Sequence, residues 1–321
     1  MRFAVIFPGQ GSQKVGMGHD LFEQTEIGKK IFEKINAVTG KDLSNIILNG
    51  PSEELNQTKN TQISIVAISI ILVLLLEEKI KIKNLSFNPF ACCGHSLGEL
   101  TALWYTDLID LDSFLKLVLL RGEIMQKAPE GGMAAILNLT SEKIEALLKE
   151  NNLKDKLVIA NHNSPSQLVI SGNKDAIQSL PELIKKADGK TIILPVGGAF
   201  HSPLMNEPAN LFINAINKLK ITNKAKIPIY QNSDGLPSEE SKDIVEKLKK
   251  QMISPVYWTQ TINNLVTEKV STFIEIGPGK VLTGLVKKIN PETDCYNIED
   301  LDSLNDFIDK YEHKLLSTRT T

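Results

Sequence analysis

The chain has 321 residues, a length that favours two domains of roughly 150 residues each over one large domain. Hydrophobic residues make up 42% of it and charged residues 23%, proportions typical of a globular protein with a sizeable core, which excludes disordered and fibrous proteins. The formal net charge of −2 gives no indication of a nucleic-acid or anionic-membrane partner, and only three of the 36 basic residues are arginines: Arg2, Arg121 and Arg319.

The first part of the chain alternates predicted strands with predicted helices. A continuous apolar run at 2–7, ended by Pro8 and Gly9, indicates a buried strand followed by a glycine-rich loop. Further along, the patterns predict helices at 20–37 and 62–78, a buried strand at 89–94, and helices at 97–104 and 112–128. Because strands and helices follow one another in this order, we expect a parallel sheet covered by helices.

The pattern changes after 129–132, a segment that contains Pro and two Gly. The residues predict a strand at 133–137, a helix at 141–150, strands at 157–160 and 167–171 with a turn at 163–166, a helix at 175–187 and a strand at 191–194. The order β-α-β-β-α-β is that of a ferredoxin-like unit. We therefore expect a small ferredoxin-like domain at 129–197, inserted into a large α/β domain formed by 1–128 and 198–321. The large domain resumes with a helix at 203–218 and strands at 226–231 and 270–276.

A nucleophile motif lies between the strand at 89–94 and the helix that begins at Leu97. Gly94-His-Ser-Leu-Gly98 matches G-x-S-x-G in the strand–turn–helix context of an α/β-hydrolase-like sheet. The tight turn exposes the hydroxyl of Ser96 and leaves the backbone N–H of Leu97 free at a helix N-terminus, where it can bind an oxyanion. The alternative is a serine that only caps the helix.

A nucleophilic serine needs a base, and His201 is the best candidate by position. It follows the return to the large domain and precedes the helix at 203–218, whereas His95 adjoins the serine and is expected to line the pocket. No Asp or Glu lies closer to it than Glu207, so the third group of a triad is left open, with a backbone carbonyl as one option. The other histidines are His19, His162 and His313.

Arg121 lies on the apolar face of the helix at 112–128. This face also carries Phe114, Leu117, Val118, Ile124, Met125 and Ala128. A buried guanidinium is costly unless an anion pairs with it, and no carboxylate stands one turn away on this face. Two hypotheses remain: a structural ion pair with a carboxylate distant in sequence, or a bidentate clamp for the carboxylate of a substrate.

The cysteines and apolar runs indicate the compartment. The three cysteines, Cys92, Cys93 and Cys295, are odd in number and two are adjacent, which argues against a disulfide framework and favours reduced thiols in the cytoplasm. The apolar run before Pro8 is too short for a signal peptide. The run at 63–76 is shorter than the about 20 residues of a membrane span, so it predicts a buried helix.

Taken together, these motifs resemble the malonyl-CoA:acyl-carrier-protein transacylases of fatty-acid synthesis over nearly the whole chain. The matching segments are Phe7-Pro-Gly-Gln-Gly-Ser-Gln13, Gly94-His-Ser-Leu-Gly-Glu99, Arg121-Gly122, Asn161-His-Asn-Ser-Pro-Ser-Gln167, Ala199-Phe-His-Ser-Pro-Leu-Met205, Gln251 before Pro255-Val-Tyr-Trp258, and Glu275-Ile-Gly-Pro-Gly-Lys-Val-Leu282. Cys92-Cys93 replace the usual aliphatic residues and Ile63 stands where Pro is frequent, two departures that change packing only.

The resemblance implies a role for each matching residue. Ser96 would carry the acyl group, His201 would be its base, and the backbone carbonyl of Gln251 would orient that base. The N–H groups of Gln10 and Leu97 would form the oxyanion hole, and Arg121 would bind the malonyl carboxylate. Asn163, Phe200 and His95 would line the pocket, Phe200 being the malonyl-selecting form of a position where related polyketide acyltransferases for methylmalonyl have Ser.

The implied activity is transfer of malonyl from malonyl-CoA, through an ester on Ser96, to the phosphopantetheine thiol of acyl carrier protein. Its partners would be that carrier and a coenzyme A thioester, with no metal or other cofactor, no nucleic acid and no membrane. Two alternatives stay open: an esterase or thioesterase, and a catalytically inactive acyltransferase-like binding module. We expect a stand-alone cytoplasmic enzyme rather than a domain of a fused synthase.

Overall fold

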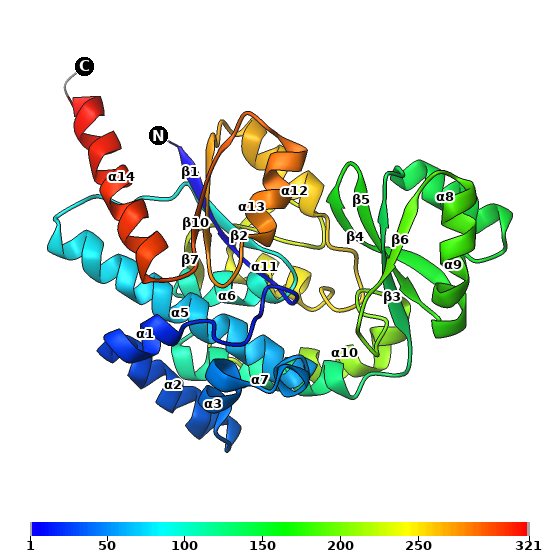
Figure 1. The fold of residues 1–321 in the computed structure, drawn as a ribbon, viewed down its shortest axis with the longest axis horizontal. Coiled ribbons are helices and arrows are strands. Elements are labelled where there is room, and N and C mark those ends of the chain that lie inside the picture. Colours follow the sequence, from blue (N-terminus) through cyan, green and yellow to red (C-terminus); the bar gives the residue numbers. More distant parts are fainter. Residues whose placement is uncertain (1, 320–321) are drawn as a thin grey trace.

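A six-stranded sheet forms the centre of the computed structural model, which describes residues 2–319 (Figure 1). Its strand order is β10-β9-β1-β2-β7-β8, and all neighbouring strands are parallel except β8, which runs antiparallel to β7. The strands are β1 (Phe3–Phe7), β2 (Ala91–Gly94), β7 (Lys224–Tyr230), β8 (Pro237–Glu240), β9 (Thr272–Ile276) and β10 (Asp294–Ile298). The predicted parallel sheet is therefore confirmed.

Helices cover both faces of this sheet, which explains why its central strands β1 and β2 are short, fully buried apolar runs. In β1, Phe3, Val5 and Phe7 pack into one core, while Ala4 and Ile6 pack into the other. The helices on the first face include α5 (Thr58–Ile82), α6 (Leu97–Tyr105), α7 (Leu111–Gln126) and α14 (Leu301–Arg319). The second face is covered by α12 (Trp258–Thr267) and α13 (Val281–Ile289).

The predicted buried helix at 63–76 lies inside α5. Its apolar residues are buried except for the half-buried Leu74, and α5 extends beyond the prediction to Thr58 and Ile82. No helix within residues 2–319 combines the length and apolar character needed to cross a membrane.

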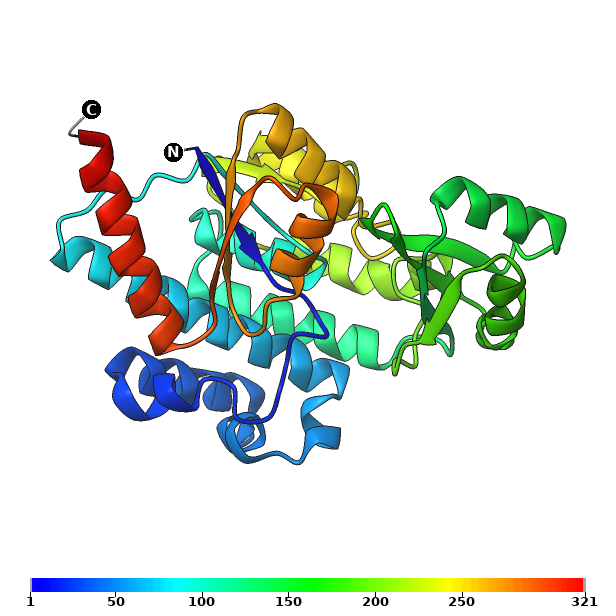
Figure 2. The same cartoon turned by 45° about the horizontal axis from the view of Figure 1, so that its top comes forward.

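A second, four-stranded antiparallel sheet lies at one end of the molecule, with α8 and α9 on its outer side (Figures 1 and 2). Its order is β4-β5-β3-β6. The elements are β3 (Gly132–Leu137), α8 (Ser141–Glu150), β4 (Leu157–Ser164), β5 (Gln167–Gly172), α9 (Lys174–Lys186) and β6 (Lys190–Ile193). Antiparallel bridging between Glu130 and Gly198 brings the two connections to the rest of the chain together.

Several element boundaries differ from the sequence predictions, among them the following three. The helix expected at 20–37 is two helices, α1 (His19–Gln24) and α2 (Glu26–Thr39), because Thr25 is extended and its hydroxyl caps α2 at the N–H of Gly28. The turn expected at 163–166 is tighter, since Ser164 pairs with Gln167, so Asn163 lies within β4. The helix expected at 203–218 is a short 3₁₀ turn followed by α10 (Asn206–Ile216).

The prediction missed several elements, most of them after the strand at 226–231. These are α3 (Leu43–Asn49), α4 (Ser52–Leu55), β8, α11 (Ser241–Leu248), α12, α13, β10 and α14.

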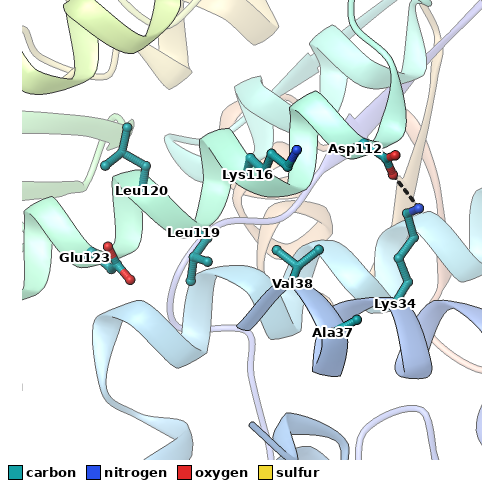
Figure 3. Close-up of a pocket in the computed structure, with 8 residues that line it drawn as sticks. All are labelled: Lys34, Ala37, Val38, Asp112, Lys116, Leu119, Leu120 and Glu123. Atoms are coloured by element: carbon teal, nitrogen blue, oxygen red, sulfur yellow. Dashed lines mark ion pairs between the residues drawn. The ribbon is translucent and has the colours of Figure 1, made fainter. Parts of the chain in front are cut away.

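The outer face of α7 lines a surface groove against α2 (Figure 3). An ion pair between Lys34 and Asp112 crosses it, and Leu119 and Leu120 form part of its apolar wall. Because this face of α7 is partly open to solvent, the buried side of the helix is the one that carries Arg121, and that side faces the interior.

Candidate active site

Ser96 stands at the junction of β2 and α6, in a conformation that non-glycine residues rarely adopt, with φ 49° and ψ −100°. The glycines on both sides are required by close contacts. A Cβ on Gly94 would lie 2.0 Å from the carbonyl carbon of Gly98, and one on Gly98 would lie 2.0 Å from the carbonyl oxygen of Phe7. The G-x-S-x-G motif thus forms a sharp turn that leaves the hydroxyl of Ser96 half-buried at the carboxyl edge of the sheet.

His201 lies against this hydroxyl, with 2.8 Å between its Nε2 and the Oγ of Ser96. Its Nδ1 is 2.9 Å from the carbonyl oxygen of Gln251 and 3.2 Å from that of Ser254. Since carbonyl oxygens only accept hydrogen bonds, Nδ1 carries the proton and Nε2 is free to accept the proton of Ser96. A backbone carbonyl thus fills the position for which the sequence offers no carboxylate.

The environment of His201 holds it in the neutral form that a base requires. Its side chain is buried, and burial together with the positive charge of Arg121 lowers its pKa to about 3. In the free enzyme, the imidazole is therefore neutral throughout the physiological pH range.

Arg121 reaches the same hydroxyl from α7, with its Nη2 2.9 Å from the Oγ of Ser96. Its Nη1 donates to the Oε1 of Gln62 at 2.9 Å and its Nε to the Oε1 of Gln251 at 3.3 Å. The side chain is 1% exposed, and burial lowers its pKa to about 10. Across residues 2–319 no carboxylate lies within ion-pair distance of it, so the structure shows no direct contact of the kind that a structural ion pair would need.

The predicted pocket residues lie around this centre. The Nε2 of His95 is 2.8 Å from the Oδ1 of Asn163, a contact that joins the turn to β4 of the small sheet. Burial lowers the pKa of His95, and its ring meets Trp258 edge-on at 5.6 Å. Phe200, next to His201, is buried, and Gln10 lies half-buried in the loop after β1.

The remaining histidines do not reach the hydroxyl of Ser96. His162 stacks on Tyr257, with 5.1 Å between their ring centroids, while His19 and His313 are exposed on the surface. Of the five histidines, the structure brings His201 to the nucleophile and His95 beside it.

Two polar residues at the centre were missed by the sequence reasoning. The Oδ1 of Asn232 accepts from the backbone N–H of Ser96 at 2.7 Å, and its Nδ2 donates to the carbonyl oxygen of Gly94 at 2.7 Å. Gln62 is fully buried in α5 and bonds Arg121. A signal existed for Asn232, because it lies two residues after the end of β7, at the edge where sheets of this type bind ligands.

Comparison with known proteins matches this geometry to a family. The model of the acyl transferase domain matches residues 4–301. A malonyl CoA-acyl carrier protein transacylase of Bacillus subtilis is 38% identical over 308 residues, covering 94% of this chain and 95% of that protein.

Solved structures agree. An acyl carrier protein S-malonyltransferase from Vibrio cholerae is 36% identical with a TM-score of 0.88, covering 96% of this chain and 100% of that one. A malonyl-transacylase in complex with its type II PKS acyl-carrier protein is 34% identical with a TM-score of 0.89, covering 95% of this chain and 98% of that one. The resemblance seen in the sequence is confirmed: the chain belongs to the acyl transferase family, in the group of the malonyl CoA-acyl carrier protein transacylases.

Proposed function

We propose that this protein transfers the malonyl group from malonyl-CoA to the phosphopantetheine thiol of acyl carrier protein, supplying fatty-acid synthesis. One observation carries the proposal: the Oγ of Ser96 lies 2.8 Å from the Nε2 of His201 and 2.9 Å from the Nη2 of Arg121. A base and a buried guanidinium on one hydroxyl suit an acyl group that has a reactive thioester at one end and a carboxylate at the other.

In the first step, Ser96 attacks the thioester carbonyl while His201 takes the hydroxyl proton. The C–O bond of the ester forms, the C–S bond breaks, and His201 returns the proton to the departing thiolate of coenzyme A. In the second step, the carrier thiol gives its proton to His201 and attacks the ester, and Ser96 leaves as the hydroxyl. The first step moves the acyl group from a thiol to a hydroxyl and the second from that hydroxyl to another thiol, both without redox change, and we expect no metal or other cofactor.

The backbone N–H groups of Gln10 and Leu97 are proposed as the oxyanion hole. Leu97 is the first residue of α6, where N–H groups are not used within the helix. The loop that carries Gln10 packs on the same turn, since a Cβ on its neighbour Gly9 would lie 2.5 Å from the carbonyl oxygen of His95. Neither N–H group has a hydrogen-bond partner among the residues described.

Arg121 is proposed to hold the malonyl carboxylate. A guanidinium has about five N–H donors. Three of those of Arg121 bind neutral oxygens here, so two remain for a carboxylate. We propose that the acyl pocket is lined by Phe200, which precedes His201, and by the hydrogen-bonded pair His95 and Asn163. A bulky Phe200 leaves less room for a branched acyl group, which supports selection of malonyl over methylmalonyl.

The finer fold description also stays a proposal. The order β4-β5-β3-β6, with the helices on one side, supports a ferredoxin-like small domain at 129–197. The Ser96 turn after β2 supports an α/β-hydrolase-like large domain formed by 1–128 and 198–321. Unpaired cysteines, two of them buried, support a cytoplasmic location.

The experiment that tests this function compares transfer with hydrolysis. We expect malonyl from malonyl-CoA to appear on the thiol of holo acyl carrier protein much faster than as free malonate. An esterase or thioesterase would release malonate whether or not the carrier is present. An inactive binding module would do neither.

A further inference from the structure

A buried carboxylate, Glu99, lies beneath the nucleophile turn and has no role in the mechanism above. It sits in the first turn of α6, three residues after Ser96, and is 1% exposed. Its Oε1 accepts from the Nε2 of Gln231 at 3.2 Å, and its Oε2 accepts from the N–H of Asn232 at 3.0 Å and the Nε2 of Gln251 at 3.2 Å. All three partners are N–H donors, as an ionised carboxylate, which only accepts, requires. Burial raises the pKa of Glu99, and these three hydrogen bonds together with the charge of Arg121 counteract that rise.

Gln251 connects this carboxylate to all three reacting groups. Its Nε2, besides binding Glu99, donates to the carbonyl oxygen of Ser96 at 2.9 Å. Its Oε1 accepts from the Nε of Arg121 at 3.3 Å, and its backbone carbonyl accepts from the Nδ1 of His201 at 2.9 Å. A displacement of this one residue would therefore move the nucleophile, the base and the guanidinium together.

Asn232 connects Glu99 to the strained turn itself. Its N–H binds Glu99, while its side chain holds the N–H of Ser96 and the carbonyl of Gly94, both at 2.7 Å. Since Ser96 has the unfavourable φ of 49°, the turn depends on such contacts to keep its shape.

Charge balance points in the same direction. Arg121 is buried without an ion pair within the described residues, and a lone buried cation is strongly unfavourable. Glu99 is the buried carboxylate that interacts electrostatically with it, through the side-chain amide of Gln251, which accepts from Arg121 and donates to Glu99.

Resting on the proposed malonyl transfer, we propose that Glu99 is a positioning residue of that reaction. Ionised, it fixes Gln251 and Asn232, and through them the geometry of Ser96, His201 and Arg121. It also supplies the negative charge that keeps Arg121 buried in the enzyme before a substrate carboxylate arrives.

The chain offers a matched control in Glu275. This carboxylate is also fully buried and also accepts only from N–H donors, here the backbone groups of Leu282 at 3.1 Å and Thr283 at 2.7 Å. It caps the N-terminus of α13 and touches none of the reacting residues. Glu275→Gln thus removes the same buried charge with the same change of atoms, but outside the site.

The test is single-turnover malonylation of Ser96 by malonyl-CoA, in which the amplitude counts competent sites and the rate constant reports their geometry. Glu99→Gln should lower the rate constant about 10- to 100-fold at full amplitude, without raising the malonyl-CoA concentration at half-saturation, because small displacements of reacting groups cost rate of this order. Glu275→Gln should keep the wild-type rate constant, even if its amplitude falls.

A double-mutant cycle tests the route through Gln251. Gln251→Met should lower the rate constant by a comparable factor, and adding Glu99→Gln should lower it little further, since both changes break one connected network. A wild-type rate constant in Glu99→Gln would overturn the proposal, as would a wild-type rate constant in Gln251→Met, which stays measurable if Glu99→Gln fails to fold. Failure of the proposed function itself looks different: the wild-type enzyme would then form no malonyl ester, or would release the malonyl group as free malonate instead of passing it to the carrier thiol.

Discussion

Replacing Arg121 with Ala removes the guanidinium proposed to hold the substrate carboxylate. Two charge-assisted hydrogen bonds to a carboxylate contribute about 1.5–3 kcal/mol each, or about 3–6 kcal/mol together. Because about 1.4 kcal/mol corresponds to a factor of ten, kcat/KM for malonyl-CoA should fall about 10²- to 10⁴-fold. Acetyl-CoA has no carboxylate, so its transfer loses only the contacts of Arg121 with Ser96, Gln62 and Gln251, and it should fall far less than malonyl transfer or even rise.

The assay measures transfer from malonyl-CoA and from acetyl-CoA to holo acyl carrier protein, for wild type and Arg121→Ala in parallel. The ratio of the two kcat/KM values is independent of how much of the variant is folded, so it isolates recognition of the carboxylate. A similar loss for both substrates would refute the clamp and return Arg121 to a purely structural role.

Three further predictions follow from the same geometry. Burial and the charge of Arg121 lower the pKa of His201 to about 3, so between pH 6.5 and 3 the unfolded chain binds a proton that the folded state excludes. The free energy of unfolding should therefore fall as the pH drops through this range. Urea unfolding at pH 7 and pH 5 should show a smaller fall in His201→Gln than in the wild type. Gly98→Ala places a Cβ 2.0 Å from the carbonyl oxygen of Phe7 and should destabilise the protein by about 1–3 kcal/mol or more, whereas Gly284→Ala in α13, with nothing within 4 Å, should be neutral or stabilising in the same unfolding experiment. Phe200→Ser should raise transfer of methylmalonyl relative to malonyl; an unchanged ratio in a competition assay would remove Phe200 from substrate selection.

The parts of the fold that the sequence predicts well are those with a strong local signal. β1 and β2 are short apolar runs because helices cover both faces of their sheet. α5 is apolar over most of its length because it is buried over most of its length. β10 escaped prediction because its residues, Asp-Cys-Tyr-Asn-Ile, form a mostly half-buried edge strand with little hydrophobic pattern. The break at Thr25 was missed because apolar residues continue at helical spacing on both sides of it.

The candidate site divides in the same way. Ser96 is visible from a local motif, and Arg121 from one cation on an apolar face. His201 could be chosen only by position, and Gln251 only through the family resemblance, because no pattern joins residues 50 apart. Asn232 and Glu99 act through contacts that span more than 130 residues, so only the fold shows that they meet beneath Ser96.

The central claim is that Ser96 carries the malonyl group between coenzyme A and acyl carrier protein, and mass spectrometry of the intact protein tests it most directly. After incubation with malonyl-CoA, the wild type should gain the mass of one malonyl group, located on the peptide that contains Ser96, and should lose it when holo acyl carrier protein is added. Ser96→Ala should gain nothing. An unmodified wild-type enzyme, or a malonyl group that persists in Ser96→Ala, would contradict the account.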